Sequence, residues 1–90
     1  MDYEWDPAKA AINLAKHGIG FDAIRGFDWS LAVVIADNRG HGERRWRAFG
    51  PIGERMHAVA FTARGGRVRV ISLRKANARE IRAHAAKTQA

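Results

Sequence analysis

The chain has 90 residues, of which 47% are hydrophobic and 28% charged, a composition typical of a folded domain and not of a disordered segment. Sixteen Lys and Arg residues against nine Asp and Glu give a formal net charge of +7, which favours a polyanion or an acidic protein as partner. Cysteine is absent, which excludes disulfides, thiolate nucleophiles and zinc sites built on cysteine.

The first predicted elements are a short edge strand at residues 3–5 and a helix that begins after Asp6. Asp6 is a favourable N-cap residue, and Pro7 suits the first helical position, where its missing N–H costs nothing. Gly18 is expected to end the helix, because glycine readily adopts the left-handed conformation of a helix C-terminus.

The last turn of this helix carries two basic residues, Lys16 and His17. On a helical wheel they share a narrow polar stripe with Lys9 and Asn13, and His17 lies at the border of the stripe. A half-buried border position allows the pKa of a histidine to be tuned. The simpler alternative is a histidine that only interacts with the helix dipole. A second short helix is predicted at residues 21–27.

Four strands are predicted in the second half of the chain. Residues 31–36 are rich in Val and Ile, and the segment RRWRAF alternates arginine with aromatic residues. A pair of alternating segments flanks Gly65-Gly66, which is a strong hairpin signal. Turn residues separate the other strands. The predicted strands are residues 31–36, 44–49, 57–64 and 67–74, with turns at 37–40 and 50–53.

The hairpin determines which side chains share a face of the sheet. A two-residue loop places Arg64 opposite Arg67, and a regular continuation of this register pairs His57 with Arg74. One face of the hairpin is then apolar, whereas the other carries Arg64, Arg67 and Arg69. In this register Arg64 and Arg74 lie on opposite faces, and a loop longer by one residue would change that.

The last predicted helix begins after Asn77, because Glu80 follows at capping-box spacing, and it runs to about Lys87. Helices at both ends and hairpin-connected strands between them indicate an α+β fold. We expect N-terminal helices, a four-stranded antiparallel sheet and a C-terminal helix.

The sequence also bears on domain organisation and location. No repeat or linker divides it, so we expect a single domain at residues 1–90. The start is acidic and lacks the apolar region of a secretory signal. The longest apolar stretch, residues 31–36, is too short to span a bilayer. A soluble cytoplasmic protein without a membrane partner is therefore expected.

Histidine and arginine are the residues that could carry chemistry. Metal-free RNA cleavage needs a base for the 2′-hydroxyl proton, an acid for the leaving oxygen and cations for the phosphate charge. His17 is the best acid–base candidate, and Glu43 lies in a glycine-bounded loop that could reach a site. Four histidines without zinc-ligand spacing and scattered carboxylates favour no metal site and no cofactor.

Four ordered segments resemble the BrnT toxin family. The opening EWDPAKAAINLAKHGIGF is similar to the family signature W-D-x-x-K…N…K-H-G-[IV]-x-F, so that Lys16 and His17 match it. The other three segments are GFDWS, HGERRWRAFG and RVRVISLRKANARE. The sequence departs from the family pattern at Leu73, where a small residue is usual, and at Ala83-His84, where an aromatic pair is common.

The resemblance implies a RelE-like fold and a metal-independent endoribonuclease toxin of a type II toxin–antitoxin system. It also implies neutralisation by a cognate BrnA-like antitoxin with a ribbon-helix-helix domain, with two toxins on an antitoxin dimer. The expected activity residues are His17, Arg64 and Arg74, followed by Lys16 and Glu43. The expected RNA-binding residues are Arg44, Arg67 and Arg69.

Two other function classes are compatible with the same sequence. A non-catalytic nucleic-acid-binding module would share the basic surface but bind RNA without cleaving it. A pure interaction protein would use its positive charge for an acidic antitoxin alone, and RNA would then not compete with that partner.

Overall fold

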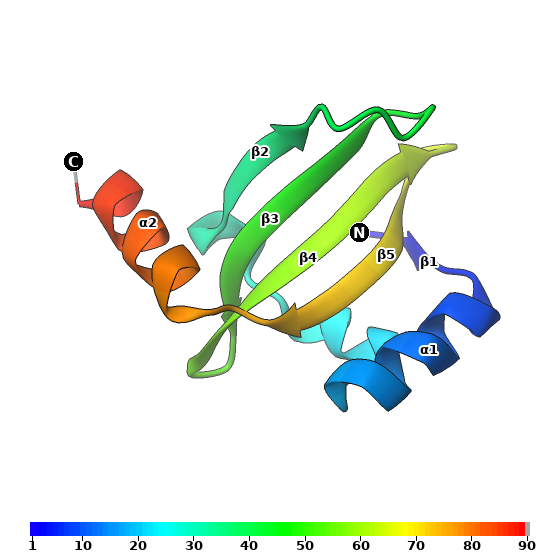
Figure 1. The fold of residues 1–90 in the computed structure, drawn as a ribbon, viewed down its shortest axis with the longest axis horizontal. Coiled ribbons are helices and arrows are strands. Elements are labelled where there is room, and N and C mark those ends of the chain that lie inside the picture. Colours follow the sequence, from blue (N-terminus) through cyan, green and yellow to red (C-terminus); the bar gives the residue numbers. More distant parts are fainter. Residues whose placement is uncertain (90) are drawn as a thin grey trace.

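The computed structural model describes residues 1–89 and contains one five-stranded sheet, with the α-helices α1 and α2 at opposite sides of it (Figure 1). Two 3₁₀ helices, η1 and η2, connect α1 to the sheet. The elements in chain order are β1 (Tyr3–Glu4), α1 (Pro7–His17), η1 (Phe21–Gly26), η2 (Trp29–Leu31), β2 (Val33–Asp37), β3 (Arg45–Ile52), β4 (Arg55–Arg64), β5 (Arg67–Lys75) and α2 (Ala78–Thr88).

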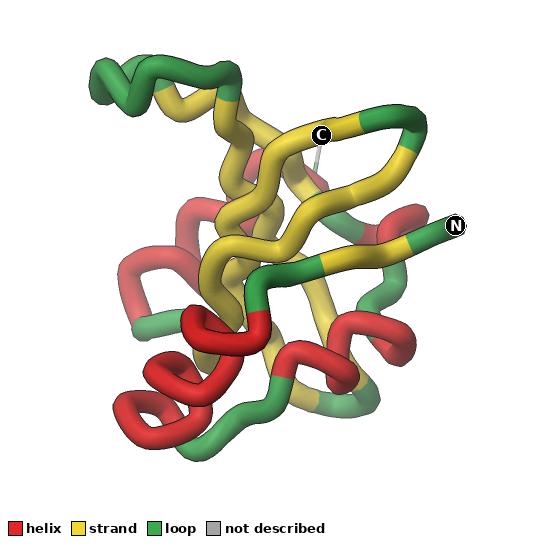
Figure 2. Tube along the Cα trace, turned by 90° about the vertical axis from the view of Figure 1, so that its right-hand side faces the viewer, coloured by secondary structure: helices red, strands yellow, loops and turns green. Residues whose placement is uncertain are grey.

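The sheet is mixed, with the strand order β1-β5-β4-β3-β2. Strands β2 to β5 pair in an antiparallel manner, whereas β1 lies parallel to β5 and aligns Tyr3 with Val68 (Figure 2). The predicted four-stranded antiparallel sheet is therefore wrong in strand number. A two-residue strand carries too little pattern to reveal that it pairs with a strand more than sixty residues away.

Helix α1 begins and ends where the sequence predicts. The Asp6 side chain accepts a hydrogen bond from the Ala8 backbone N–H at 2.8 Å, which satisfies one of the free donors of the first turn. Gly18 adopts a left-handed conformation with φ 71°, and its N–H donates to the Leu14 carbonyl. These two caps place His17 at the last position of α1.

Asn13 joins α1 to the outer edge of β5. Its side-chain amide donates to the carbonyls of Leu73 (2.8 Å) and Ile19 (3.1 Å), and its Oδ1 accepts from the Leu73 N–H at 3.1 Å. Only 6% of the residue is exposed. Because β1 pairs with β5 only at Val68 and Arg69, the amide of Asn13 takes the place of a neighbouring strand farther along that edge.

A β-bulge interrupts the β4–β5 hairpin. Arg64 pairs with Arg67 as predicted, but Phe61 pairs with Val70 and the next pair joins Ala60 to Ser72. Ile71 is the extra residue, so side chains after it exchange faces. The predicted pairing of His57 with Arg74 is therefore wrong.

Beyond the bulge, His57 pairs with Lys75, and Arg74 lies opposite Ala58. Because Ala58 and Arg64 are six residues apart on β4, they point to the same face. Arg64 and Arg74 therefore share a face, although the loop contains only two residues. We call this side of the sheet the arginine face and the opposite side the core face.

The core face packs against η1, η2 and the N-terminal segment. Val59, Val70 and Leu73 are almost fully buried on it, and Phe21 and Ile24 of η1 cover them. The residues predicted to be apolar on the hairpin thus form the core, and they continue past the bulge with Leu73. Trp46 stacks on Phe61 at a centroid distance of 5.9 Å and belongs to this core.

Several element boundaries differ from the predictions. The segment at residues 21–27 is helical, but of the 3₁₀ type, and ends at Gly26. Strand β2 begins two residues later than predicted, because residues 29–31 form η2. Most of the turn predicted at residues 50–53 belongs to β3, which continues to Ile52. Ile52 also forms an isolated antiparallel bridge with Phe27. The capping box predicted at the start of the last helix is confirmed, since the side chains of Asn77 and Glu80 each accept a hydrogen bond from the other residue's backbone N–H.

Gly50 is required where β3 passes beneath an aromatic ring. A methyl group added there would lie 2.9 Å from Cζ of Phe27 and 3.1 Å from Cβ of Ala32. We expect Gly50→Ala to lower the free energy of unfolding by about 1–3 kcal/mol through overpacking, measured by urea denaturation. Gly26→Ala is the matched control, because its methyl would lie 3.4 Å from Cγ2 of Ile52. Equal stability of the two variants would contradict the prediction.

No helix in the described residues 1–89 is long and apolar enough to cross a membrane.

Candidate functional site

The centre of the arginine face contains a hollow of about 210 Å³. Its floor consists of short side chains from β4 and β5, which leave space above the sheet. Three arginines from separate elements surround the space: Arg39 from the β2–β3 loop, Arg47 from β3 and Arg74 from β5. The floor residues are Ala58, Ala60 and Ser72. We call this space the arginine hollow.

A second hollow lies between the end of α1 and the edge of β5. It is lined by His17 and Lys16 of α1 and by Ile71 and Ser72 of β5. His17 is half-buried, whereas Lys16 is exposed. Ser72 lines both hollows, because the bulge at Ile71 turns it to the arginine face. Ser72 is thus shared by the hollow that His17 lines and the hollow that Arg74 lines.

Arg74 is tied to the beginning of α2. Its Nη1 and Nη2 donate to the two carboxylate oxygens of Glu80 at 2.7 and 2.8 Å. Glu80 also accepts from the Asn77 N–H at 2.9 Å as part of the capping box. The guanidinium of Arg74 lowers the pKa of Glu80, and the Asn77 N–H lowers it further, although burial acts in the opposite direction. The ion pair orients Arg74 at the edge of the arginine hollow.

This ion pair makes a testable contribution to stability. We expect Glu80→Gln to reduce the free energy of unfolding by about 1–2 kcal/mol at pH 7, since charged hydrogen bonds are lost. A lowered native pKa stabilises the fold above the ordinary glutamate pKa, and this contribution disappears as the pH falls through the native value. The stability difference between wild type and Glu80→Gln should therefore shrink below about pH 5.

Urea denaturation at several pH values checks this expectation. Glu54→Gln, at an exposed position in the β3–β4 turn, is the matched control and should change stability little at any pH. A difference for Glu80→Gln that stays constant down to pH 3 would rule out the ion pair as its source.

Arg64 and Glu43 lie at the other end of the sheet. Arg64 ends β4 beside the hairpin loop and approaches Glu43 at 3.4 Å, while Arg45 donates to the same carboxylate at 3.1 Å. The side-chain hydrogen bond from Arg45 is the main cause of a lowered pKa of Glu43. Six residues of β4 separate Arg64 from the partner of Arg74, which is roughly 20 Å. The two predicted arginines share a face but do not meet in one site.

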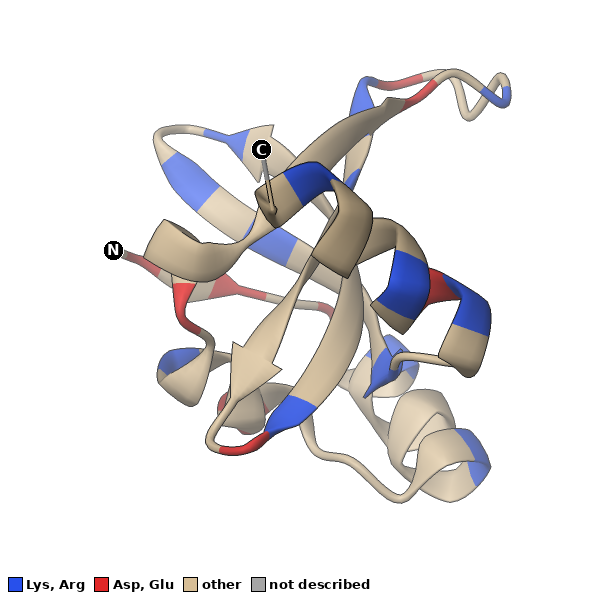
Figure 3. Ribbon diagram, turned by 90° about the vertical axis from the view of Figure 1, so that its left-hand side faces the viewer, with Lys and Arg blue, Asp and Glu red and all other residues tan. Residues whose placement is uncertain are grey.

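The predicted RNA-binding residues are also spread along this end of the sheet. Arg69 donates to Glu4 of β1 at 2.8 Å, and Arg67 is exposed beside the hairpin loop. Arg44 is exposed in the loop before β3, where its carbonyl accepts a hydrogen bond from Thr62. In Figure 3, Lys and Arg positions (blue) occur on the strands as well as on the helices.

The sequence analysis selects Glu43 and Arg44 from the β2–β3 loop but does not identify Asp37 or Arg39 as site residues. Asp37 is buried at the end of β2 and accepts two hydrogen bonds from Arg39, each of 2.7 Å. His41 Nε2 lies 3.2 Å from Oδ2 of the same carboxylate, and its Nδ1 lies 3.3 Å from Nη1 of Arg45. The hydrogen bonds from Arg39 hold the pKa of Asp37 well below its usual range. The carboxylate thus folds the loop back so that Arg39 borders the arginine hollow.

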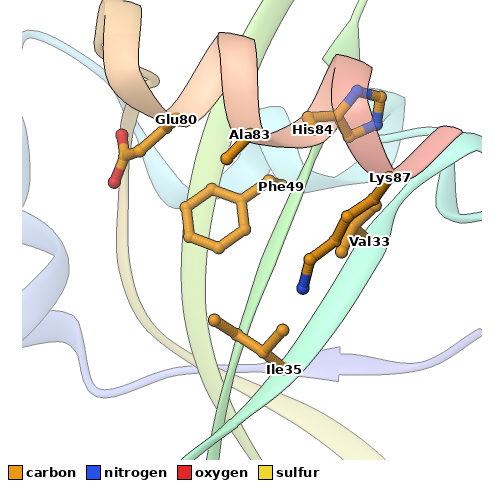
Figure 4. A pocket seen from close by; sticks show the side chains of 7 residues that line it. All are labelled: Val33, Ile35, Phe49, Glu80, Ala83, His84 and Lys87. Carbon is orange, nitrogen blue, oxygen red and sulfur yellow. The ribbon is translucent and has the colours of Figure 1, made fainter. Parts of the chain in front are cut away.

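A third, apolar cavity of about 130 Å³ lies beneath α2. Figure 4 shows Phe49 and Ile35 on the sheet below Ala83, His84 and Lys87 of the helix. Two of the three residues that depart from the family pattern, Ala83 and His84, therefore line this cavity, whereas Leu73 is buried in the core. His84 Nε2 lies 2.8 Å from the Leu31 carbonyl, which ties α2 to η2.

Within residues 1–89, no group of three or more His, Asp or Glu side chains is arranged to hold a metal ion.

The chain matches a known protein family and a solved structure. The family model described as "Ribonuclease toxin, BrnT, of type II toxin-antitoxin system" matches residues 5–80. The crystal structure of the Brucella abortus ribonuclease toxin BrnT is similar, with a TM-score of 0.70 and 32% sequence identity. The match covers 86% of this chain and 97% of the Brucella chain. A comparison with curated proteins found no match.

The fold and these matches define a small toxin of a type II toxin–antitoxin system. Within that class, the chain belongs to the BrnT family of ribonuclease toxins. The family resemblance read from the sequence motifs is thereby confirmed.

Proposed function

We propose that the chain is an endoribonuclease that cleaves RNA without a metal ion, through attack by the 2′-hydroxyl on the adjacent phosphate. In this reaction His17 exchanges protons with the reacting oxygens, and arginines hold the phosphate charge. The products are a 2′,3′-cyclic phosphate and a free 5′-hydroxyl. One observation supports this proposal: Ser72 lines both the hollow that contains His17, between α1 and β5, and the arginine hollow.

The geometry suggests different roles for the predicted residues. Arg74 borders the arginine hollow and faces the reacting phosphate, whereas Lys16 adds positive charge beside His17. Arg64, with Arg44, Arg67 and Arg69, lies too far along the sheet for the same phosphate and contacts RNA on either side of the cleavage site. Glu43 orients Arg45 and Arg64 and takes no part in the proton transfer.

A cleavage assay with two modified conditions tests the mechanism. Purified protein is incubated with an RNA oligonucleotide in EDTA, and in parallel with the same oligonucleotide carrying 2′-deoxyribose throughout. We expect cleavage of the RNA in EDTA, a cyclic phosphate end by mass spectrometry, and no cleavage of the deoxy strand. Cleavage of the deoxy strand would exclude attack by the 2′-hydroxyl, and binding without any cleavage would support the non-catalytic module.

We further propose a BrnA-like ribbon-helix-helix antitoxin as partner, two toxins on each antitoxin dimer, and a cytoplasmic location where both RNA and antitoxin occur. The family's type II class supports an antitoxin partner, and the net charge of +7 suits an acidic binding segment. Co-expression with the neighbouring small gene, followed by mass measurement of the purified complex, tests the partner and its stoichiometry.

A further inference from the structure

The three arginines of the arginine hollow differ in how their charges are balanced. Arg39 binds the Asp37 carboxylate through two hydrogen bonds, and Arg74 binds the Glu80 carboxylate through two. Arg47 is different, because none of the ion pairs within residues 1–89 includes it. The hollow thus holds two neutralised arginines and one arginine without a counterion.

The Nε of Arg47 is buried and has no hydrogen-bond partner among the described residues. A buried N–H of a charged group is costly to leave without an acceptor, and such groups in native proteins usually have one. The guanidinium carbon lies 5.8 Å from the centre of the Phe49 ring. The Arg47 cation thus lies near an aromatic ring and has no counterion among the described residues 1–89.

The surroundings of Arg47 suit an anion. The charge of Arg47 acts on the Glu80 carboxylate, whose pKa is lowered first by its hydrogen bond with Arg74 and to a smaller extent by Arg47. Both oxygens of Glu80 are already bonded to Arg74, so they do not compete for Arg47. The small side chains of Ala58, Ala60 and Ser72 leave the space open, and Ser72 adds a hydroxyl to its wall.

We propose that the arginine hollow is a phosphate-binding site in which Arg47 is the residue that binds the anion. A phosphodiester oxygen accepts from the Arg47 guanidinium, and Arg39 and Arg74, fixed by their carboxylates, border the same phosphate. Guanidinium groups bind phosphate oxygens through paired hydrogen bonds, which an ammonium group does not reproduce. The inference rests on the proposed RNA substrate, because it names the residue that holds the phosphate beside His17.

An NMR titration tests this directly. The protein is labelled with ¹⁵N in its arginine side chains, and the Arg47 Nε–H signal is assigned by its loss in Arg47→Gln. One arm adds inorganic phosphate, a second adds an RNA made non-cleavable by 2′-O-methyl groups, and a third adds chloride at matched ionic strength. We expect the Arg47 signal to shift with phosphate and with RNA, but not with chloride.

Binding of the same non-cleavable RNA is then measured for the variants. Arg47→Gln should weaken binding at least tenfold, and Arg47→Lys should restore only part of the affinity. Arg55→Gln removes the same charge from an exposed position on the opposite face of β4, and should change binding less than twofold at moderate salt. Urea denaturation should show that Arg47→Gln is at least as stable as the wild type, because it removes an unsatisfied buried donor.

The outcomes separate this inference from the proposed function. An unshifted Arg47 signal, or RNA binding by Arg47→Gln equal to that of Arg55→Gln, overturns the phosphate site but leaves RNA cleavage intact. A wild type that neither binds nor cleaves RNA overturns the proposed function. In that case a phosphate-specific shift still establishes the anion site, and its absence refutes it.

Discussion

Replacement of His17 by alanine is expected to reduce RNA cleavage by about 10²–10⁴-fold, the usual contribution of a positioned acid or base. His17 is half-buried at the C-terminus of α1, beside Ile71 and Ser72, and the helix ends at Gly18 through its own backbone cap. The substitution therefore removes the imidazole without disturbing the caps that hold the helix. Single-turnover cleavage of a labelled oligonucleotide, at protein in excess over RNA, gives the rate.

The matched control is His84→Ala, which removes an imidazole from α2 that contacts the Leu31 carbonyl. We expect this variant to cleave RNA within about threefold of the wild-type rate, a change of less than 1 kcal/mol in the barrier. A growth assay in cells should show the same order, with His17→Ala far less toxic than His84→Ala. Undiminished cleavage by His17→Ala would remove His17 from the mechanism.

The second large effect is expected for Asn13→Ala, which should reduce the free energy of unfolding by about 3–5 kcal/mol. The amide of Asn13 satisfies the Leu73 N–H and the carbonyls of Leu73 and Ile19. Each buried backbone group left without a partner costs about 1–3 kcal/mol. Since native proteins are stable by only about 5–15 kcal/mol, this loss is a large part of the total and should lower the unfolding midpoint markedly.

Thermal and urea denaturation followed by circular dichroism measure this loss. Asn38→Ala is the matched control, because Asn38 is exposed in the β2–β3 loop. It should stay within about 0.5 kcal/mol of the wild type, as surface substitutions usually do. Similar unfolding midpoints for Asn13→Ala and Asn38→Ala would show that the amide does not secure the edge of β5.

The sequence correctly predicts much of the local structure of the chain. Asp6, Pro7 and Gly18 define α1, the Gly65-Gly66 pair defines the hairpin loop, and the Asn77–Glu80 spacing defines the cap of α2. Each of these signals depends only on a few neighbouring residues, whose backbone preferences are strong enough to decide the local conformation.

The sequence does not predict the features that depend on residues far apart in the chain. Nothing in RVRVISLRK indicates that Ile71 is a bulge, because the segment alternates regularly up to that point. Asn13 reads as one member of a polar stripe, whereas its amide is buried against Leu73, sixty residues away. The Asn13 contact depends on how α1 packs on β5, and the bulge depends on how β4 pairs with β5. Residue patterns provide no signal for either.

Long-range contacts also explain which properties of the candidate site the sequence does not predict. The resemblance selects Arg74, and the structure adds that its guanidinium is paired with Glu80. Arg47 reads as one arginine among several in RRWRAF, and only the fold shows that its Nε is buried without a partner. The register prediction separated Arg64 from Arg74 by face, whereas the structure separates them by distance along the strands.

The contact between Asn13 and Leu73 also constrains the order in which the fold can assemble. Because the two residues are sixty positions apart, α1 has no strand edge to dock on until β5 has left the ribosome. Contacts of such high sequence separation form late and slow the folding of small domains. His17 and Ser72 line one hollow between α1 and β5, so this hollow forms only after β5 has joined the sheet and α1 has docked on its edge.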